Sequence, residues 1–354
     1  MKKVVVAMSG GVDSSLAAAL LVEQGVEAVG VTLKLLARAE TGFGCCGSPA
    51  DVDDAKRVCE TLGMAHYTLD LAELFADKVV RPFIDSYMHA RTPNPCVECN
   101  RSLKFGYLLG LAQAWGAEAV ATGHYARVEG GRLLKAVDAA KDQTYFLYSL
   151  SPRELSGVQF PVGSLTKAQV RAQAQVLGLR TAQKPESQEI CFVPRRDYRG
   201  FLERELGAGA AGFAPGPIQD PSGREIGRHQ GLASYTVGQR KGLGVMAPEP
   251  TYVIELQPET NTLVVGGSDD TLCRSFVAEA VTWTSGRFPP EAEIQARIRH
   301  RHEPARAVLT DLLGGRVRVE FEVAQRAVTP GQAAVFYRGD EVLGGGTITR
   351  REKR

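Results

Sequence analysis

The stretch Val4-Val5-Val6-Ala7-Met8-Ser9-Gly10-Gly11-Val12-Asp13-Ser14 decides the fold class. Its first five residues are all apolar, which is typical of a strand buried on both faces. A helix is expected directly afterwards, over Ser14–Glu23. Two glycines between a strand and a helix let the backbone approach a ligand, and the helix N-terminus favours an anion. The order of these parts predicts a phosphate-binding loop rather than a plain glycine turn. The loop lacks a Gly-Lys-Ser/Thr ending, so it is not an ordinary P-loop.

The same alternation of apolar runs and helical periodicity continues over residues 1–205. Further strands are predicted at Glu27–Leu36, Ala65–Leu69 and Ala119–Thr122, and further helices at Val52–Leu62, Leu74–Ala90 and Phe105–Trp115. Strands that alternate with helices predict an α/β domain with a doubly wound parallel sheet. The ligand of such a sheet is expected beyond the carboxyl ends of its strands.

The composition changes after about residue 205. Residues 206–267 are expected to form a small middle domain, because Gly, Ala and Pro become frequent and helical periodicity fades. Short β-rich runs between Gly and Pro turns follow in residues 268–354, including Arg316–Val323 and Ala333–Tyr337. They predict a C-terminal β-barrel or sandwich.

Charge and cysteine usage narrow the class of protein. The net charge is +2, but residues 287–354 hold 13 Lys and Arg against 9 Asp and Glu, which favours contact with a polyanion there. No apolar run has the roughly 20 residues that a membrane helix needs. Seven cysteines in such a chain indicate catalytic or metal-binding use rather than a disulfide framework. They are Cys45, Cys46, Cys59, Cys96, Cys99, Cys191 and Cys273. We therefore expect a cytoplasmic protein without membrane contact.

Three of these cysteines lie in two distinctive segments. Cys96 and Cys99 form a Cys-x-x-Cys within Pro93–Asn100, and Cys191 lies within Glu186–Phe192. By spacing alone, a Cys-x-x-Cys suits half a zinc site, a redox pair or cluster ligation. The sequence contains no second Cys-x-x-Cys that would complete a zinc ribbon.

Ser9-Gly10-Gly11-Val12-Asp13-Ser14 resembles the signature of the PP-loop ATP pyrophosphatases, the adenine nucleotide alpha hydrolase-like enzymes that split ATP between its α and β phosphates. The resemblance implies that ATP is the cofactor and that Leu33 and Gly123 flank its adenine. It also implies Mg²⁺ on the phosphates, with Asp13 helping to hold it. The residues that would cradle the pyrophosphate are Ala7, Met8, Ser9, Gly10, Gly11, Val12, Asp13 and Ser14.

The two cysteine segments resemble motifs of the tRNA 2-thiouridylase family. Pro-Asn-Pro-x-x-x-Cys-Asn matches Pro93–Asn100, and Ser-x-x-Ile-Cys-Phe matches Ser187–Phe192. The resemblance spans nearly the whole chain and implies ATP-dependent 2-thiolation of the wobble uridine of tRNA. ATP would adenylate the uridine C2 oxygen, and sulfur would then displace AMP. Cys191 would carry a persulfide received from a sulfur-carrier protein, and Cys99 would be its partner.

One position departs from the family pattern. Most members carry Asp where this chain has Cys96, and that Asp is regarded as a general base. A third thiol leaves two routes open: a disulfide between Cys99 and Cys191, or a four-iron four-sulfur cluster on Cys96, Cys99 and Cys191.

The resemblance also implies the contacts to the anticodon arm of tRNA. Lys141–Leu147 matches a tRNA-contacting stretch, and His229–Leu243 matches part of the family's middle domain. Arg297–His302 alternates charge as a strand would, so Arg297, Arg299 and Arg301 are predicted to share one face. The candidate tRNA-contacting residues are Asn94, Pro95, His124, Lys141, Asp142, Gln143, Arg299, His300, Arg301 and Gln332.

Three other functions are weaker alternatives. A 2-thiocytidine synthase usually carries paired Cys-x-x-Cys motifs, and an amide-forming ligase needs an ammonia source, neither of which the sequence contains. A non-catalytic RNA-binding protein with a structural metal would bind tRNA without converting ATP to AMP.

Overall fold

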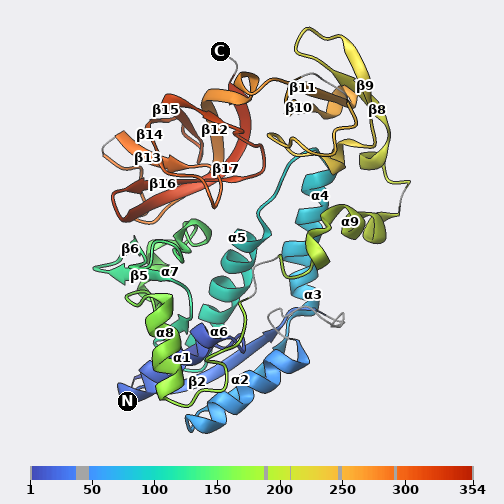
Figure 1. Ribbon diagram of the computed structural model, residues 1–354. Helices are drawn as coiled ribbons and strands as arrows, with labels where there is room; N and C mark the ends of the chain where they lie inside the picture. The colour runs from blue at the N-terminus through green and yellow to red at the C-terminus, as the bar shows by residue number, and fades with distance from the viewer. Residues whose placement is uncertain are drawn as a thin grey trace.

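The computed structural model describes residues 2–36, 48–186, 190–207, 209–245, 249–290 and 293–352. Their strands form sheets of five, four and eight strands (Figure 1). The eight-stranded sheet joins the C-terminal strands to two strands from the N-terminal part of the chain. None of the helices in these ranges is both long enough and apolar enough to cross a bilayer.

The five-stranded sheet confirms the predicted doubly wound parallel architecture. All its pairings are parallel, in the order β3-β2-β1-β4-β7. The strands are β1 (Lys3–Ala7), β2 (Glu27–Lys34), β3 (Ala65–Asp70), β4 (Ala119–Thr122) and β7 (Val158–Gln159). Because β1 is central and its neighbours run in the same direction, the loops after β1, β2 and β4 meet at one edge of the sheet.

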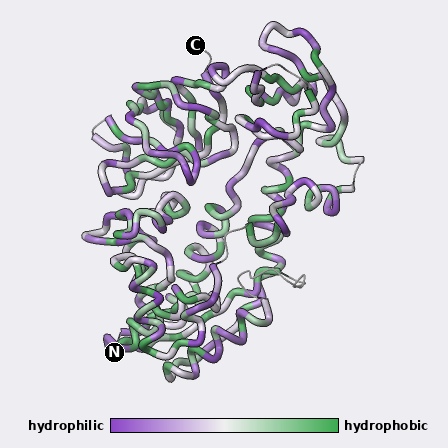
Figure 2. The backbone as a smooth tube through the Cα atoms, viewed as in Figure 1, coloured by the Kyte–Doolittle hydropathy of each residue, from purple (hydrophilic) through white to green (hydrophobic). Residues whose placement is uncertain are grey.

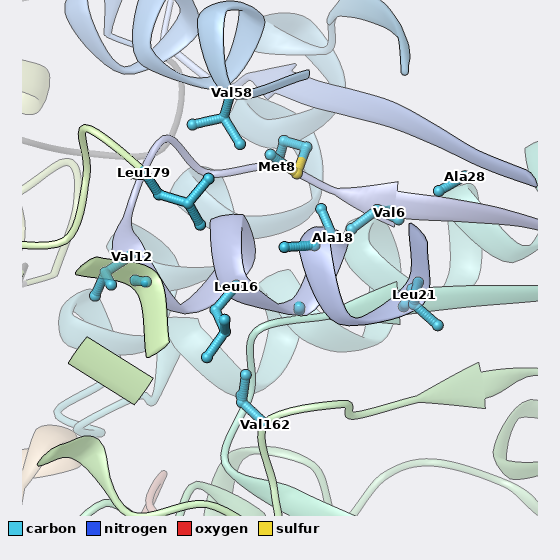
Figure 3. Packing of buried hydrophobic residues seen from close by; sticks show 14 of the residues in the cluster. Val6, Met8, Val12, Leu16, Ala18, Leu21, Ala28, Val58, Val162 and Leu179 are labelled. Atoms are coloured by element: carbon cyan, nitrogen blue, oxygen red, sulfur yellow. The ribbon is translucent and has the colours of Figure 1, made fainter. Parts of the chain in front are cut away.

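Alternate residues of β1 face two separate hydrophobic cores. Val4 and Val6 pack in one core and Val5 in the other, as the two-residue period of a strand requires. The first core is covered by α1 (Val12–Glu23), α2 (Pro49–Thr61) and α8 (Lys167–Val176). Figure 3 shows Val6 and Met8 in this core among Leu16 and Ala18 of α1, with Val58 of α2.

The second core is covered by two helical stretches, of which the first agrees with the predicted helix Leu74–Ala90 to within two residues at each end. The first runs through α3 (Ala72–Phe75), a π-helical segment (Ala76–Val80) and α4 (Arg81–Met88). The second runs through α5 (Pro95–Cys99), another π-helical segment (Asn100–Tyr107) and α6 (Leu108–Ala114). The second stretch begins ten residues before the predicted Phe105, because Pro95 starts α5 at the first helical position, where proline is favoured. Cys96 and Cys99 therefore lie on a helix.

The middle part contains a small sheet of its own. It has the order β10-β11-β8-β9, with β8 (Gly216–Gln219), β9 (Glu225–His229), β10 (Tyr252–Gln257) and β11 (Thr262–Gly266). α9 (Tyr198–Leu206) precedes it. Figure 1 shows this sheet at the far end of the molecule from the N-terminus.

The C-terminal part is a closed six-stranded barrel. Its strands are β12 (Leu272–Trp283), β13 (Glu293–Arg297), β14 (Ala305–Asp311), β15 (Val317–Arg326), β16 (Ala333–Arg338) and β17 (Glu341–Glu352). Pairing of β12 with both β15 and β17 closes the barrel. β15 alternates buried and exposed residues, and the barrel shows mixed hydropathy along its strands (Figure 2). The hairpin of β5 (Ala126–Glu129) and β6 (Arg132–Lys135) adds to β17 from outside.

One prediction for the barrel is wrong. β13 ends at Arg297, and residues 298–302 form a bend and turn rather than a continuing strand. Arg297, Arg299 and Arg301 therefore do not share a strand face. Arg297 instead turns inward to Asp142, at 3.5 Å, while Arg299 and Arg301 are exposed.

Candidate active site at the carboxyl edge of the parallel sheet

The phosphate loop is a tight turn between β1 and α1. Ser9 N donates to Ser14 Oγ at 3.2 Å, and Ser15 Oγ donates to the Gly11 carbonyl at 2.8 Å. Gly10 has φ +71°, and a Cβ there would lie 2.3 Å from the Asp51 carbonyl oxygen at the start of α2. Only glycine fits this conformation and this close approach. The loop is thus fixed with the N-terminus of α1 facing the sheet edge, as an anion site requires.

The two residues predicted to flank adenine lie at the same edge. Gly123 follows β4, and a Cβ on it would come within 2.5 Å of Ser14 N, so its backbone packs on the N-terminus of α1. Leu33 lies in β2 and is buried in the second core. The strand order brings these positions together with the phosphate loop, although they are distant in sequence.

Asp13 is held by two side chains from other elements. Lys167 Nζ, at the start of α8, lies 2.8 Å from both carboxylate oxygens, and Tyr125 Oη donates to Oδ1 at 2.8 Å. Burial raises the pKa of Tyr125, and the Asp13 carboxylate raises it further, so the phenol stays protonated as a donor. The Lys167 side chain is only 11% exposed, so this ion pair is screened little by solvent.

Glu186 extends the same network. Its Oε1 lies 2.9 Å from Lys167 Nζ and its Oε2 lies 2.7 Å from Lys141 Nζ. Burial acts to raise the pKa of Glu186, but the hydrogen bonds and charges of Lys141 and Lys167 outweigh it and lower the pKa. Glu186 is therefore ionised and joins two segments that the sequence analysis treated separately.

Lys184 binds the phosphate loop from another direction. Its Nζ lies 3.0 Å from the Gly10 carbonyl oxygen, 2.6 Å from Asp51 Oδ1 and 2.7 Å from Asp54 Oδ2. Burial acts to lower the pKa of Lys184, yet the two carboxylates raise it overall. A permanent cation thus contacts the back of the turn that would hold phosphate.

Cys99 and Cys191 contribute to one hydrophobic cluster. Cys99 is buried at the end of α5, and Cys191 is partly buried against the same residues, which include Leu33 and Phe192. Cys96, one helical turn from Cys99, is exposed. Within the described ranges, no group of three His, Cys, Asp or Glu residues is arranged to hold a metal ion. The structure thus associates Cys99 with Cys191 but does not assemble the three thiols as a metal centre.

The barrel contacts the segment that precedes α5. Gln332 Nε2 donates to the carbonyl oxygens of Thr92, at 3.0 Å, and Pro93, at 3.3 Å, and Thr92 N donates to the Pro330 carbonyl at 2.9 Å. Gln332 therefore contacts the two residues that immediately precede Asn94 and Pro95, and the barrel borders the start of α5.

The stretch Lys141–Leu147 lies between the phosphate loop and the barrel. Asp142 is buried and pairs with Arg297, while the Gln143 side chain accepts from Tyr125 N at 2.9 Å. The Phe146 ring lies 4.6 Å from the His300 ring, centroid to centroid. Partial burial and the charge of nearby Arg297 lower the pKa of His300, although part of its side chain is open to solvent. The candidates Asp142 and Gln143 thus make internal contacts, which leaves His300, Arg299 and Arg301 as the exposed members of the set.

His124 lies beside the site in a hydrophobic setting. Its Nδ1 is 2.7 Å from Thr122 Oγ1, and its ring contacts Phe105 and Phe160. Burial, together with the charge of Lys104, places the pKa of His124 well below its usual value. The imidazole is neutral and suited to hydrogen bonding rather than to a phosphate ion pair.

A separate pocket of about 290 Å³ lies between α9 and the middle sheet. Its lining includes two arginines, Arg199 and Arg228, with Gln230 and Tyr235, and none of the described residues that line it carries a carboxylate. It contains part of His229–Leu243, where exposed Arg240 and Lys241 add positive charge.

The lysines next to the phosphate loop were not predicted from the sequence. Lys167 and Lys184 lie 154 and 174 residues from the loop groups that they contact. The only local signal was the position of Lys184 and Glu186 immediately before the Ser187–Phe192 motif. Asp51, which is buried at the start of α2, had no signal beyond a helix-capping pattern.

The parallel sheet and the Ser-Gly-Gly-Val-Asp-Ser turn after β1 place the protein in the class of PP-loop ATP-binding proteins. Family models match the whole of this architecture. A tRNA methyl transferase HUP domain matches residues 2–195, a tRNA methyl transferase PRC-barrel domain matches residues 200–267, and an aminomethyltransferase beta-barrel domain matches residues 273–348.

Curated relatives align over almost the full length. The tRNA-specific 2-thiouridylase MnmA of Geobacter metallireducens is 46% identical, with 98% of this chain and 96% of the relative covered. That of Carboxydothermus hydrogenoformans is 48% identical, with 99% and 98% covered. The chain belongs to the tRNA-specific 2-thiouridylase family. Among solved structures, a 4-thiouridine synthetase–RNA complex with bound ATP gives a TM-score of 0.39 at 19% identity, with 58% of this chain and 51% of that chain covered.

Proposed function

We propose that the protein is a tRNA-uridine 2-sulfurtransferase, which uses ATP to replace the C2 oxygen of the wobble uridine by sulfur. The observation that carries this proposal is that Cys99 and Cys191 pack in the same hydrophobic core, which also contains Leu33 of β2. Two thiols from segments far apart in sequence that join one core suit sulfur transfer to an adenylated oxygen. The full-length similarity to 2-thiouridylases supports the same reaction.

The chemistry has two stages. In the first, the uridine C2 oxygen attacks the α-phosphorus of ATP, diphosphate leaves, and the oxygen becomes part of an AMP leaving group. In the second, the terminal sulfur of a Cys191 persulfide attacks C2 and AMP departs with the oxygen. The Cys99 thiolate then attacks Cys191 Sγ, which breaks the persulfide S–S bond, leaves the thiocarbonyl on the base and forms a Cys99–Cys191 disulfide. A thiol reductant returns the two cysteines to their starting state.

The phosphate loop supports the first stage. Backbone N–H groups at the start of α1 face the phosphates, and the partial positive charge of the helix N-terminus stabilises the departing diphosphate. Mg²⁺ would neutralise phosphate charge here, and the oxygens of Asp13 and Ser14 are ligands of the type that it prefers. Lys167 and Lys184 offset the negative charge of the carboxylates around the loop, which would otherwise repel the phosphates.

The tRNA would lie across the barrel and the middle part. Arg299 and Arg301 are exposed on the turn after β13, and the pocket with Arg199 and Arg228 offers a second cationic surface for phosphate groups. Gln332 and the Pro93–Pro95 segment border the position where an extruded base would meet the cysteines, because a stacked base cannot reach such a site. A cytoplasmic sulfur-carrier protein with its own persulfide would load Cys191.

The test is an anaerobic thiolation assay with purified tRNA, ATP and a persulfide donor, in which 2-thiouridine and AMP are measured together. Cys191→Ser and Cys99→Ser are expected to abolish 2-thiouridine, whereas Cys96→Ser keeps it. Iron and acid-labile sulfide in the wild type, both lost in Cys96→Ser together with activity, would replace the disulfide route by a cluster route. Binding of tRNA without any ATP-dependent 2-thiouridine in the wild type would reject the enzymatic proposal.

A further inference from the structure

Arg297, the last residue of β13, lies where the C-terminal barrel meets the stretch Lys141–Leu147. Its Nη1 lies 3.5 Å from the carboxylate of buried Asp142, and its guanidinium lies over the Tyr145 ring, 5.8 Å from the centroid. The Arg297 side chain is only 15% exposed. Its guanidinium therefore serves contacts within the protein rather than a ligand in solvent.

Other donors of Arg297 hold the turn that follows β13, residues 298–302, hereafter the 298–302 turn. Arg297 Nε donates to the His302 carbonyl at 3.0 Å, and Nη2 donates to the His300 carbonyl. A guanidinium presents five N–H donors in a fixed fork, so one side chain can contact two carbonyls and a carboxylate together. The conformation of the 298–302 turn is thus tied to a residue that lies outside it.

Further contacts fix the 298–302 turn in place. His302 is buried, and its N–H donates to the Arg299 carbonyl at 3.0 Å, which closes the turn. The His300 ring lies 4.6 Å from the Phe146 ring, centroid to centroid. The backbone of the turn is therefore packed on the stretch Lys141–Leu147 from one side and closed by its own hydrogen bond.

Two cations are exposed on the 298–302 turn, Arg299 and Arg301. Arg299 Nη1 donates to the Arg326 carbonyl at 3.2 Å, which directs the side chain and uses one of its five donors. The separation and direction of these two cations depend on the backbone of the turn. A polyanion with regularly spaced phosphates is sensitive to that geometry.

From these contacts we propose that Arg297 is a positioning residue, which holds the 298–302 turn in the conformation in which Arg299 and Arg301 meet phosphates of the tRNA backbone. The inference rests on the proposed function, in which these two arginines contact tRNA. A turn that is ordered before binding reduces the conformational entropy lost on binding. Arg297 therefore strengthens tRNA binding through the turn without touching the RNA.

The first experiment measures the order of the turn in the full-length protein without tRNA. Trypsin cleaves after arginine, so cleavage after Arg299 and Arg301, quantified by mass spectrometry, reports opening of the turn. Arg297→Lys keeps the positive charge, but an ammonium group lacks the planar fork that reaches both carbonyls. Cleavage is expected to be roughly tenfold faster in Arg297→Lys than in the wild type, because charge-assisted hydrogen bonds are lost.

Two further variants complete this experiment. Arg318→Lys is the matched control, because Arg318 also uses two donors on the same barrel, to Glu352 at 3.2 and 2.8 Å, and it should leave the cleavage rate unchanged. Asp142→Asn keeps Arg297 but removes its carboxylate partner and is expected to give an intermediate rate. It provides a second reading if Arg297→Lys folds poorly.

The second experiment measures the affinity for an unmodified tRNA transcript without ATP, at one salt concentration, because such affinities depend on salt. Arg297→Lys is expected to weaken binding roughly tenfold although the net charge is unchanged. In the Arg299→Met/Arg301→Met background, Arg297→Lys is expected to cause no further loss, because a positioning residue acts only through the groups that it positions. A residue that merely stabilises the barrel would give additive losses.

Wild-type cleavage rates in both Arg297→Lys and Asp142→Asn would overturn the inference. So would a loss of tRNA affinity on Arg297→Lys that is equal with and without Arg299 and Arg301. A wild-type protein that binds no tRNA would reject the proposed function and the tRNA-binding role of Arg297 together. The cleavage experiment needs neither tRNA nor turnover, so it distinguishes a failure of the turn contacts from a failure of the proposed function.

Discussion

Lys167 Nζ contacts both carboxylate oxygens of Asp13 at 2.8 Å, so the first residue of α8 is bound to the phosphate loop. The Thr166 cap and its box with Gln169 fix the start of α8 independently of this pair. The capping box therefore fixes the backbone from which the Lys167 side chain reaches Asp13.

A double-mutant cycle on this pair tests how strongly the two residues interact. Lys167→Met leaves Asp13 and Glu186 without their shared cation and should lower the free energy of unfolding by about 2 kcal/mol. The coupling energy between Lys167→Met and Asp13→Asn should also be about 2 kcal/mol. Urea unfolding of the two single variants and the double variant gives the value. Lys56→Met, at an exposed pair with Glu60, is the control and should change stability little. Additive effects of Lys167→Met and Asp13→Asn would show that the pair contributes no coupling.

Alanine substitutions at Gly10 and Gly25 distinguish the effect of crowding at the phosphate loop from the effect of backbone strain alone. Both have φ near +70°, but a Cβ at Gly10 would meet Asp51 at 2.3 Å, whereas a Cβ at Gly25 would meet nothing within 4 Å. Gly10→Ala should therefore abolish nucleotide binding measured by calorimetry, while Gly25→Ala should cost only about 1 kcal/mol of stability and retain binding. Equal nucleotide affinity in the two variants would contradict the close packing of the loop on α2.

Substitution of Gly331 tests the contact between the barrel and the segment that precedes α5, the helix that carries Cys96 and Cys99. Its φ is +92°, and a Cβ there would lie 2.8 Å from both the backbone N and O of Thr92. Gly331→Ala should displace the barrel from Thr92 and lower the thermal midpoint by several degrees, roughly 4 °C per kcal/mol or less for a chain of this size. Gly339→Ala, with φ +59° and no atom within 4 Å of the added Cβ, is the matched control. A smaller loss for Gly331→Ala than for Gly339→Ala would rule out this packing.

The lowered pKa values of the histidines allow a prediction of how the free energy of unfolding depends on pH. Five of the six have a lowered pKa, and burial is the largest cause for each: His66, His124, His229, His300 and His302. A histidine whose pKa is lowered by folding binds fewer protons in the folded state than in the unfolded state. Its contribution to the free energy of unfolding is therefore complete above pH 6.5, and it is lost as the pH falls toward the pKa of the folded state. The free energy of unfolding should therefore fall between about pH 7 and 5, as urea titrations would measure.

His124 should carry a large share of this effect. His124→Gln keeps a hydrogen-bonding side chain without the titration and should flatten the fall below pH 6.5, whereas His89→Gln, at a position two-thirds exposed, should leave it unchanged. An unchanged slope in His124→Gln would show that its imidazole is protonated in the folded state.

The sequence predicted the parts of the fold that depend on local patterns. The apolar run Val4–Met8 and the glycine pair after it are sufficient to place β1, the loop and α1, because burial on both faces and a tight turn have direct signatures. Arg297–His302 was misread because alternating charge is also compatible with a turn. The deciding interaction is the contact of Arg297 with Asp142, 155 residues earlier.

The candidate site was only partly predictable for the same reason. The loop, the cysteines and Gln332 lie in recognisable motifs, and the strand order explains why Gly123 and Leu33 join them. Lys167 has no local pattern that distinguishes it from an exposed charged residue, and Glu186 has only its position before the Ser187–Phe192 motif. Their contacts depend on α8 and residues 182–186 folding back on the loop, which propensity and periodicity do not encode.

The hairpin of β5 and β6 has a consequence for synthesis of the chain. Leu134 of β6 pairs with Glu341 of β17, and Lys135 Nζ donates to the Gly339 carbonyl, 204 residues further along. During translation, the outer edge of this hairpin lacks its neighbour until nearly the whole polypeptide has left the ribosome. A chain that ends before β17 would therefore expose the edge of β6 that normally faces β17, and an open strand edge favours aggregation.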